Sequence, residues 1–559
     1  MENGRRRCAI SHADGPAADH PLTADRQGRI EELHKTSDCT LSLLGSGNEH
    51  SVWRYVGSAR GLAGCILRVP HALEAYSGDA AKLAVLASQR ALVERLGRAY
   101  ARTPRFAADI DRSVALKLSE SARRGVRSPD GVLRAAALAM EAAAEAITED
   151  GVGASEACAA RADDGARSVL AWVEHDHSRL ASARHGVCVE LKPKAGVLPP
   201  HGSPLESFAP GRCRFCLYAG LKAQRRGGGS EAAEAAAAAA CHSLSDAAAR
   251  SRCCPLDLYS HDAERVGQAV AALLRRPGNN LRLYDMRSGR LVFGGSAGAD
   301  RCALRSLLDG AFAPPRAAGE AVALPAVSGA DGADRGGAAD DDVSSIEAQL
   351  VELLVGVVLA ERRLFERLRR VQSLARVGSA RAEAVRARAV LLAGGVEKLD
   401  ELLKSRASTT SEEAAPPVAA AAAGATAGAG ATAGATATGT AAAVAVDDLG
   451  LEGCVSILFE WLLALSASDV SLMLPIARDP AADEPCLANG SPRPQPDHDV
   501  HAPGVLEAGG ARFCYRLSAV DLGLKPQRKA HEHCVLDARI VAHWQGRPPS
   551  WSCASGARL

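Results

Sequence analysis

Short apolar runs mark the first predicted strands. Residues 39–44, 51–56 and 65–69 each have the length and composition of a strand, and the Gly45-Ser46-Gly47 turn separates the first two. This order predicts a three-stranded meander with a glycine-containing hairpin.

Segments with apolar residues at helical spacing follow at residues 80–100 and 132–147. Residues 187–191 form a mostly apolar run that stops before Pro193, which is typical of a buried strand. The mixture predicts an α+β fold. The charged, helically periodic segment 345–405 has two interpretations, a helical insertion or a partner-binding helix pair, and we favour the insertion.

Low-complexity segments interrupt this pattern, and they bury too little apolar surface to offset the entropy lost on ordering. We expect a disordered polar tail at residues 1–35, an N-terminal domain at 36–173 and a C-terminal domain at 174–559. The low-complexity insertions are predicted near residues 226–241, 311–446 and 477–510.

The composition excludes several classes of protein. The 559 residues include 66 Lys+Arg and 65 Asp+Glu, a net charge of +1, so a polybasic nucleic-acid coat is excluded. The 16 cysteines are far too few for a disulfide scaffold, so we expect mostly free thiols in a reducing compartment. We find neither a secretory signal nor a strongly apolar stretch of about 18 residues, and therefore expect a soluble protein without a membrane partner.

The glycine turn is the first candidate site. Gly45 and Gly47 would let backbone N–H groups approach phosphate oxygens, with Asn48 beside them, and Arg68 lies on a following strand-like run. A nucleotide-binding protein needs a cation there. The alternative is an ordinary hairpin.

Charged residues cluster after the predicted strand at 187–191. If the strand continued, Glu190, Lys192 and Lys194 would face one side and form a cationic spot with a neighbouring acceptor. The alternative is an edge strand protected by lysines and proline.

Cys213 and Cys216 have the CxxC spacing of a metal site. A zinc site needs a second pair, but Cys253 and Cys254 are adjacent rather than spaced, so the sequence disfavours zinc here. On a helix, Arg214, Tyr218 and Lys222 would share one face, either as donors for an anion or as a solvated surface.

Polar residues at the ends of three later apolar runs complete the candidates. Asn279 and Asn280 are turn residues or amide donors beside Arg282. Asp469 and Asp521 each lie at the edge of a strand-like segment, and phosphoryl transfer requires two such carboxylates. A single aspartate in this position is otherwise typical of a turn.

Taken in order, these motifs resemble the inositol-pentakisphosphate 2-kinase family. The matching blocks are GSGNEHSV, LRV, VELKPKAGVLP, CRFC with the following Leu and Lys, CCPLDLYS, NNLRLY, SDVSLM and VDLGLKP. The resemblance implies a two-lobed, kinase-like fold of the inositol polyphosphate kinase type. It also implies transfer of the ATP γ-phosphoryl group to the 2-hydroxyl of inositol 1,3,4,5,6-pentakisphosphate, giving phytate, with Mg²⁺ as cofactor.

The resemblance assigns roles position by position. Asp469 corresponds to the catalytic aspartate, and Lys192 would stabilise transition-state charge. Asp521 corresponds to the magnesium-binding aspartate. Residues 174–177 fall at the inter-lobe hinge, beside adenine. The implied ATP-binding residues are Gly45, Gly47, Asn48, Arg68 and Glu190. The implied inositol-phosphate-binding residues are Lys192, Lys194, Arg214, Lys222, Asn279, Asn280, Lys525 and Lys529.

Several positions depart from the family pattern. Tyr218 replaces a histidine, Lys529 an arginine, His533 a tyrosine, and Gly523 a second acidic residue. The plant members carry a zinc site in the large lobe, and residues 262–497 contain no histidine, so we expect no counterpart. Arg123, Arg124 and Arg127 all lie near the position that the resemblance gives to the family's small-lobe substrate arginine, and the sequence does not choose between them.

We expect a monomer, cytoplasmic or nuclear, that binds ATP and an inositol polyphosphate and no nucleic acid. Two alternatives remain: an inositol polyphosphate kinase of shifted specificity, and a non-catalytic scaffold that binds inositol phosphates.

Overall fold

The computed structural model describes residues 39–46, 50–57, 62, 64–71, 89–97, 100–101, 106–124, 128–150, 168–180, 183, 185–227, 253–312, 339–413, 445–479, 503–545 and 553. The chain divides into two compact units. Unit 1 comprises residues 1–77 and 105–174, and unit 2 comprises residues 78–104 and 175–559.

Unit 1 is built on a five-stranded sheet with the order β1-β2-β3-β5-β4. The strands are β1 (Thr40–Ser46), β2 (His50–Val56), β3 (Cys65–Pro70), β4 (Phe106–Asp111) and β5 (Ser168–His175). The antiparallel pairs β1–β2 and β2–β3 confirm the predicted meander.

Two helices bury their apolar faces in the core of unit 1. They are α3 (Arg112–Arg124) and α4 (Asp130–Asp150), and the second contains the predicted helix at 132–147. Trp53, Leu67, Leu118 and Leu133 meet in this core and are each at most 2% exposed.

Unit 2 is built on a seven-stranded sheet with the order β10-β11-β9-β6-β7-β8, in which β12 also pairs with β9. Strand β6 (Val187–Leu191) has the predicted bounds and is buried along its whole length. Its antiparallel partners are β7 (Leu281–Asp285) and β9 (Ser471–Arg478). The remaining strands are β8 (Leu291–Gly294), β10 (Gly504–Ala508), β11 (Ala511–Tyr515) and β12 (Ser518–Val520).

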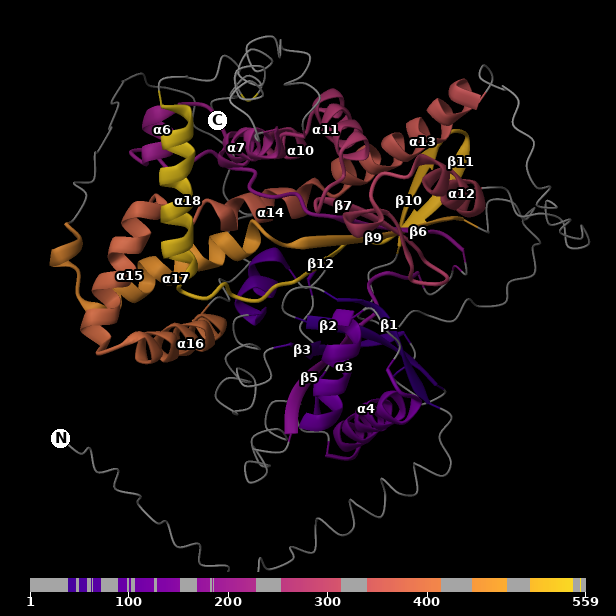
Figure 1. The fold of residues 1–559 in the computed structure, drawn as a ribbon, viewed down its shortest axis with the longest axis horizontal. Helices are drawn as coiled ribbons and strands as arrows, with labels where there is room; N and C mark the ends of the chain where they lie inside the picture. The colour runs from indigo at the N-terminus through magenta and orange to yellow at the C-terminus, as the bar shows by residue number, and fades with distance from the viewer. Residues whose placement is uncertain are drawn as a thin grey trace, which may run out of the picture. The chain divides into compact units, whose positions relative to one another are not determined.

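Helices pack beside this sheet, and α15 packs against both α17 and α18 (Figure 1). The helices that precede the long charged segment are α6 (Pro204–Phe208), α7 (Arg214–Gly227), α10 (Pro255–Leu258), α11 (Ala263–Arg275) and α12 (Arg301–Phe312). The helices that follow are α13 (Ala339–Ala360), α14 (Arg362–Gln372), α15 (Ser379–Ala393), α16 (Val396–Glu413), α17 (Leu451–Ala467) and α18 (Lys529–Trp544). Two 3-10 turns lie at Gly295–Ala297 and Val446–Asp448.

The segment interpreted as an insertion belongs to the core. Leu350 and Leu354 of α13, Phe365 of α14 and Leu403 of α16 are buried in the same cluster as β6 and α17. These apolar positions recur at helical spacing because one face of each helix packs inward, so a boundary at residue 311 does not separate an insertion from the fold.

The predicted N-terminal domain at 36–173 also differs from unit 1. Residues 78–104 belong to unit 2, where Leu92 and Leu96 of a helical stretch at 89–96 join the core of that unit. The predicted tail at 1–35 lies outside the described residues, as do most of the predicted insertions at 226–241 and 477–510 and residues 313–338 and 414–444 of the predicted insertion at 311–446.

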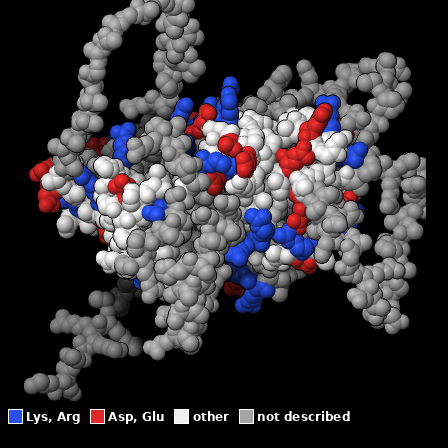
Figure 2. Space-filling model, turned by 90° about the horizontal axis from the view of Figure 1, so that it is seen from above, with Lys and Arg blue, Asp and Glu red and all other residues white. Residues whose placement is uncertain are grey.

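The surface carries both signs of charge. On the face drawn in Figure 2, Lys and Arg side chains are interspersed with Asp and Glu side chains over the described residues. Within that same part of the chain, no helix is both long enough and apolar enough to cross a membrane.

Candidate active site

Strand pairing in unit 2 brings distant candidate residues to one end of the sheet. The end of β6 lies beside the start of β9, since Leu191 pairs with Leu472. The end of β12 lies there too, since Val520 pairs with Ser471. Residues just after β6, just before β9 and just after β12 therefore leave the sheet at the same edge. These residues include Lys192 and Lys194, Asp469, and Asp521 and Lys525.

The carboxylate of Asp469 lies between two ammonium groups. Lys194 Nζ is 2.8 Å from Asp469 Oδ1, and Lys525 Nζ is 3.0 Å from Asp469 Oδ2. Partial burial alone would raise the pKa of Asp469, but the charges and hydrogen bonds of Lys194 and Lys525 together lower this pKa well below its usual range. Asp469 is therefore ionised at neutral pH, and its side chain is still 41% exposed.

The predicted common face of Lys192 and Lys194 does not form. Strand β6 ends at Leu191, and Lys194 has φ +61°, so the strand alternation stops before it reaches either lysine. Lys192 Nζ lies 4.0 Å from Glu190 Oε1, whereas Lys194 turns to Asp469. The two ammonium groups thus face different carboxylates.

Two site residues have left-handed backbones. Lys194 has φ +61° and Asp521 has φ +63°, a region that L-residues other than glycine rarely adopt. Such conformations are stabilised by their surroundings and concentrate at functional sites. Asp521 is exposed at the end of β12.

A buried glutamine holds the backbone beneath the Lys194–Asp469 pair. Gln372, at the end of α14, is 1% exposed. Its Oε1 accepts from Gly196 N at 2.8 Å, and its Nε2 donates to Lys194 O at 3.0 Å and to Ala467 O at 3.1 Å. Tyr259 adds two further links, because its hydroxyl donates to Lys194 O at 3.1 Å and lies 3.1 Å from Gln372 Nε2.

Ser466 connects the two other parts of the site. Its Oγ accepts from Lys525 N at 2.9 Å, and its carbonyl oxygen accepts from Asp469 N at 3.0 Å. The last turn of α17 therefore fixes the position of Asp469 and the backbone of Lys525 together.

Glu190 is buried in a polar network. One of its carboxylate oxygens accepts from Tyr284 Oη at 2.8 Å and from Arg282 Nη1 at 3.2 Å, and the other accepts from Ser471 Oγ at 3.0 Å. The predicted nucleotide-contacting carboxylate is thus engaged with neighbouring strands and holds Arg282 in place.

The Asn279-Asn280 turn lies against the start of the lysine segment. Asn280 O accepts from Lys192 N at 2.8 Å, so this turn positions Lys192 through the backbone. Asn279 is exposed.

A second cationic group forms around α7 and α18. Arg214 Nε donates to Asp537 Oδ1 at 2.6 Å, whereas Lys529 pairs with Glu532. As predicted for one helix face, Lys222 Nζ lies 4.5 Å from the centre of the Tyr218 ring.

The charges of this cationic group and of Asp469 both act on His533. Its pKa is lowered to about 3, first by burial and then by the charges of Arg214 and Lys529, while Asp469 opposes the shift. All three charges therefore act on one neutral imidazole, which packs edge-on against Trp461 at 5.6 Å between ring centres.

Unit 1 contains the remaining candidates. Gly45 pairs with Val52 in the β1–β2 hairpin, but Gly47 and Asn48 lie outside the described residues. Arg68 Nε donates to Glu174 Oε2 at 2.8 Å. Glu174, predicted as a hinge residue, is thus a partner of the predicted phosphate-binding arginine. Arg123 and Arg124 are exposed at the end of α3, and Arg127 lies outside the described residues.

Sequence reasoning missed Gln372 and Ser466. A polar residue within an apolar helix face is the signal that marks each of them, but only the fold shows which backbone groups they bind.

Comparisons with known proteins agree on one family. A family model described as inositol-pentakisphosphate 2-kinase matches residues 44–539. A curated Danio rerio protein named "Inositol-pentakisphosphate 2-kinase" is 31% identical over 114 residues, which cover 20% of this chain and 19% of that protein. The match thus spans about a fifth of the curated relative's length.

Proposed function

This chain belongs to the inositol-pentakisphosphate 2-kinase family, and from this premise we propose that it is an ATP-dependent kinase acting on inositol 1,3,4,5,6-pentakisphosphate. The γ-phosphoryl group of ATP would pass to the 2-hydroxyl of the inositol, giving inositol hexakisphosphate and ADP. We also propose that units 1 and 2 are the two lobes of a kinase-like fold.

The single observation that carries this proposal is the ionised Asp469 carboxylate held between Lys194 and Lys525. Phosphoryl transfer is catalysed mainly by positioning and charge stabilisation. Asp469 would accept a hydrogen bond and then the proton from the 2-hydroxyl as its oxygen attacks phosphorus. The bond from phosphorus to the bridging oxygen breaks, and ADP leaves with that electron pair.

Substrate binding would change the ion-pair partners of Lys194 and Lys525. In the structure they neutralise Asp469. A polyphosphorylated inositol presents many competing anionic oxygens, so Lys194 and Lys525 would bind phosphate and free Asp469 for the hydroxyl. Lys192, from the same segment, would stabilise charge on the transferred phosphoryl group.

Buried guanidinium nitrogens that lack a hydrogen-bond partner support anion binding. Within the described part of the chain, Arg214 Nη2 and Arg282 Nε are buried without a hydrogen-bond partner. Buried donors are nearly always satisfied, and phosphate oxygens would satisfy these. Lys222, Lys529, Asn279 and Asn280 would complete the inositol-phosphate pocket.

The nucleotide and its metal would use other residues. Asp521 offers the hard carboxylate oxygens that Mg²⁺ prefers, and the ion would supply charge neutralisation at the ATP phosphates. Gly523 offers no second carboxylate, so we propose that Asp521 is the protein ligand from this loop. Gly45, Gly47, Asn48, Arg68 and Glu190 remain the proposed ATP-binding residues.

The test is a kinase assay with Mg²⁺-ATP and inositol 1,3,4,5,6-pentakisphosphate, with products resolved by anion exchange. We expect hexakisphosphate from the wild type and a rate lower by about 10²–10⁴-fold from Asp469→Asn. Asp309→Asn removes a carboxylate from a surface ion pair in α12 and should leave the rate unchanged. A folded Asp469→Asn enzyme with wild-type turnover would refute the assigned role.

A second candidate, a kinase of shifted specificity, is favoured by the α7 surface. Tyr218 stands where the family has histidine, and its ring contacts Lys222 of the proposed pocket. The product position, determined by NMR, separates the two candidates. Inositol phosphate binding without ATP turnover would instead indicate the non-catalytic scaffold.

A further inference from the structure

Lys194 has a backbone conformation that a lysine does not favour. Its φ is +61°, and in this conformation its ammonium group reaches Asp469 at 2.8 Å. The left-handed region costs an L-residue about as much as a net hydrogen bond contributes. The turn after β6 therefore needs several hydrogen bonds from its surroundings to keep Lys194 in this conformation.

Two buried side chains supply these hydrogen bonds. Gln372 Nε2 and the Tyr259 hydroxyl donate to Lys194 O at 3.0 and 3.1 Å, and Gln372 Oε1 accepts from Gly196 N at 2.8 Å. Gln372 is 1% exposed and Tyr259 is 2% exposed, so solvent water has little access and cannot replace either donor. A Cβ on Gly196 would lie 2.4 Å from the Tyr259 ring, so the turn lies directly against that ring.

Gln372 also acts on the segment that carries Asp469. Its Nε2 donates to Ala467 O at 3.1 Å, and Ala467 is two residues before Asp469. One side chain is thus bonded to the backbone on both sides of the Lys194–Asp469 ion pair. The distance between the two charged groups therefore depends on the Gln372 amide.

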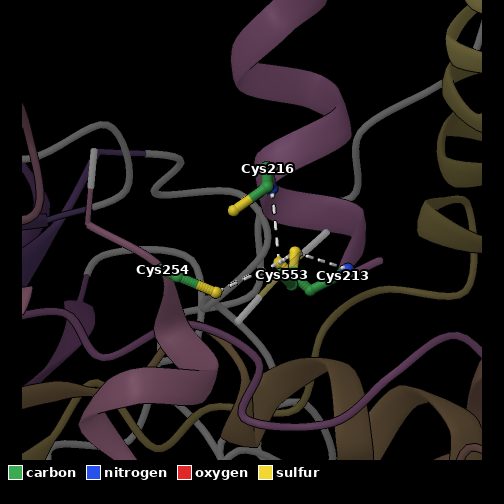
Figure 3. A group of neighbouring side chains, drawn as sticks. All are labelled: Cys213, Cys216, Cys254 and Cys553. Carbon is green, nitrogen blue, oxygen red and sulfur yellow. Dashed lines mark hydrogen bonds between the residues drawn. The ribbon is translucent and has the colours of Figure 1, made fainter. Parts of the chain in front are cut away.

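Tyr259 is held in place by its neighbours. It directly follows α10, and its ring packs edge-on against Phe365 of α14 at 5.4 Å between ring centres. Cys254 immediately precedes α10 and belongs to the group of cysteines drawn in Figure 3, where its Sγ lies 3.9 Å from Cys213 Sγ. Both ends of α10 are therefore packed, which fixes where the Tyr259 hydroxyl lies.

We propose that Gln372 and Tyr259 are positioning residues for phosphoryl transfer, which together hold Lys194 in its left-handed conformation against Asp469. This inference rests on the proposed function, because it assigns the Lys194–Asp469 pair to the reaction. Both side chains act through the backbone of Lys194 and need no contact with the inositol phosphate or ATP. The role accounts for Tyr259 of the CCPLDLYS block, which the proposed reaction does not otherwise use.

Tyr259→Phe tests the proposal, because it keeps the ring and removes only the hydroxyl. We expect kcat to fall by about 3- to 10-fold, the range that loss of a net hydrogen bond allows. The KM for inositol 1,3,4,5,6-pentakisphosphate should rise, because Lys194 is misplaced, while the KM for ATP stays unchanged. A purely structural role would reduce the amount of folded enzyme and leave both KM values unchanged.

Tyr515→Phe is the matched control. Tyr515 is 4% exposed, and its hydroxyl donates to Glu361 at 3.0 Å rather than to the active-site backbone. This variant loses the same chemical group from a similarly buried site, so its kcat and both KM values should equal those of the wild type. Wild-type kinetic constants in Tyr259→Phe, or equal losses in Tyr259→Phe and Tyr515→Phe, would overturn the proposal.

Combining Tyr259→Phe with Gln372→Leu tests whether the two residues act together. Each single variant leaves one donor to Lys194 C=O, whereas the double variant leaves none. The double variant should therefore lose more kcat than the product of the two single losses, by about 3-fold or more. A loss equal to that product would show that the residues act independently. If Gln372→Leu does not fold, Tyr259→Phe decides alone, since it leaves Lys194 C=O and the Gln372 amide with partners.

A crystal structure of Gln372→Leu gives a measurement that does not use kinase activity. Only the Tyr259 hydroxyl then donates to Lys194 O, so we expect Lys194 to leave the left-handed region and its ammonium group to lie beyond about 4 Å from Asp469. An unchanged φ and ion pair would overturn the proposal even with a fully active wild type. If the wild type makes no hexakisphosphate while Lys194 moves as expected, the proposed function fails and the control of the Lys194 conformation is upheld.

Discussion

Replacing Gln372 by leucine tests how the active-site backbone is held. Leucine has a similar volume but can neither donate nor accept a hydrogen bond. Two buried groups would lose their partner in this variant, Gly196 N–H and Ala467 C=O, whereas Lys194 C=O would keep the Tyr259 hydroxyl.

The expected loss of stability follows from that count. Each buried group left unsatisfied costs about 1–3 kcal/mol, so Gln372→Leu should lower the free energy of unfolding by roughly 2–6 kcal/mol. Urea unfolding, followed by circular dichroism, measures this as a lower midpoint with an unchanged slope.

A matched control separates burial from amide chemistry. Gln268 on α11 is exposed and donates one hydrogen bond, 3.1 Å long, to Glu264. Gln268→Leu should therefore change stability by less than about 0.5 kcal/mol. If the free energy of unfolding of Gln372→Leu also lies within about 0.5 kcal/mol of the wild-type value, the hydrogen bonds of Gln372 contribute nothing to stability and the reasoning fails.

Two further predictions concern stability. His533 has a pKa of about 3 in the fold, against its ordinary value of 6.5, so the unfolded chain binds a proton first as the pH falls. His533→Gln should therefore reduce the stability lost between pH 7 and pH 5 by about 2 kcal/mol. The control His201→Gln, at an exposed position, should not reduce this loss. Identical pH profiles of stability for His533→Gln and the wild type would contradict the prediction. Gly294 has φ +81° and a Cβ there would lie 2.1 Å from Leu281 O, whereas Gly298 has φ +72° and open space. Gly298→Ala should cost about 1–2 kcal/mol for the left-handed backbone, and Gly294→Ala clearly more, with equal melting temperatures refuting the close contact.

Local patterns in the sequence predicted local structure well. The meander of β1 to β3 and the bounds of β6 follow from short apolar runs ended by glycine or proline, which are signals of a few residues. The motif aspartate Asp469 and Lys194 were both predicted as site residues, but their contact depends on strand pairing between segments 275 residues apart.

The failures have the same physical origin. The common face of Lys192 and Lys194 requires strand alternation to continue beyond Leu191, but β6 ends there and Lys194 has a left-handed backbone. The charged, helically periodic pattern of segment 345–405 favours an insertion, yet Leu350 and Phe365 within it are fully buried.

The position of β6 at the middle of its sheet has a consequence for how the chain is synthesised. Its hydrogen-bonding partners on β9 emerge from the ribosome long after it does, since Glu190 and Ser471 are 281 residues apart. Until then one edge of an apolar strand is unpaired, which is a template for aggregation. Unit 2 should therefore fold late and slowly, and its yield in cells should depend on chaperones that shield nascent chains.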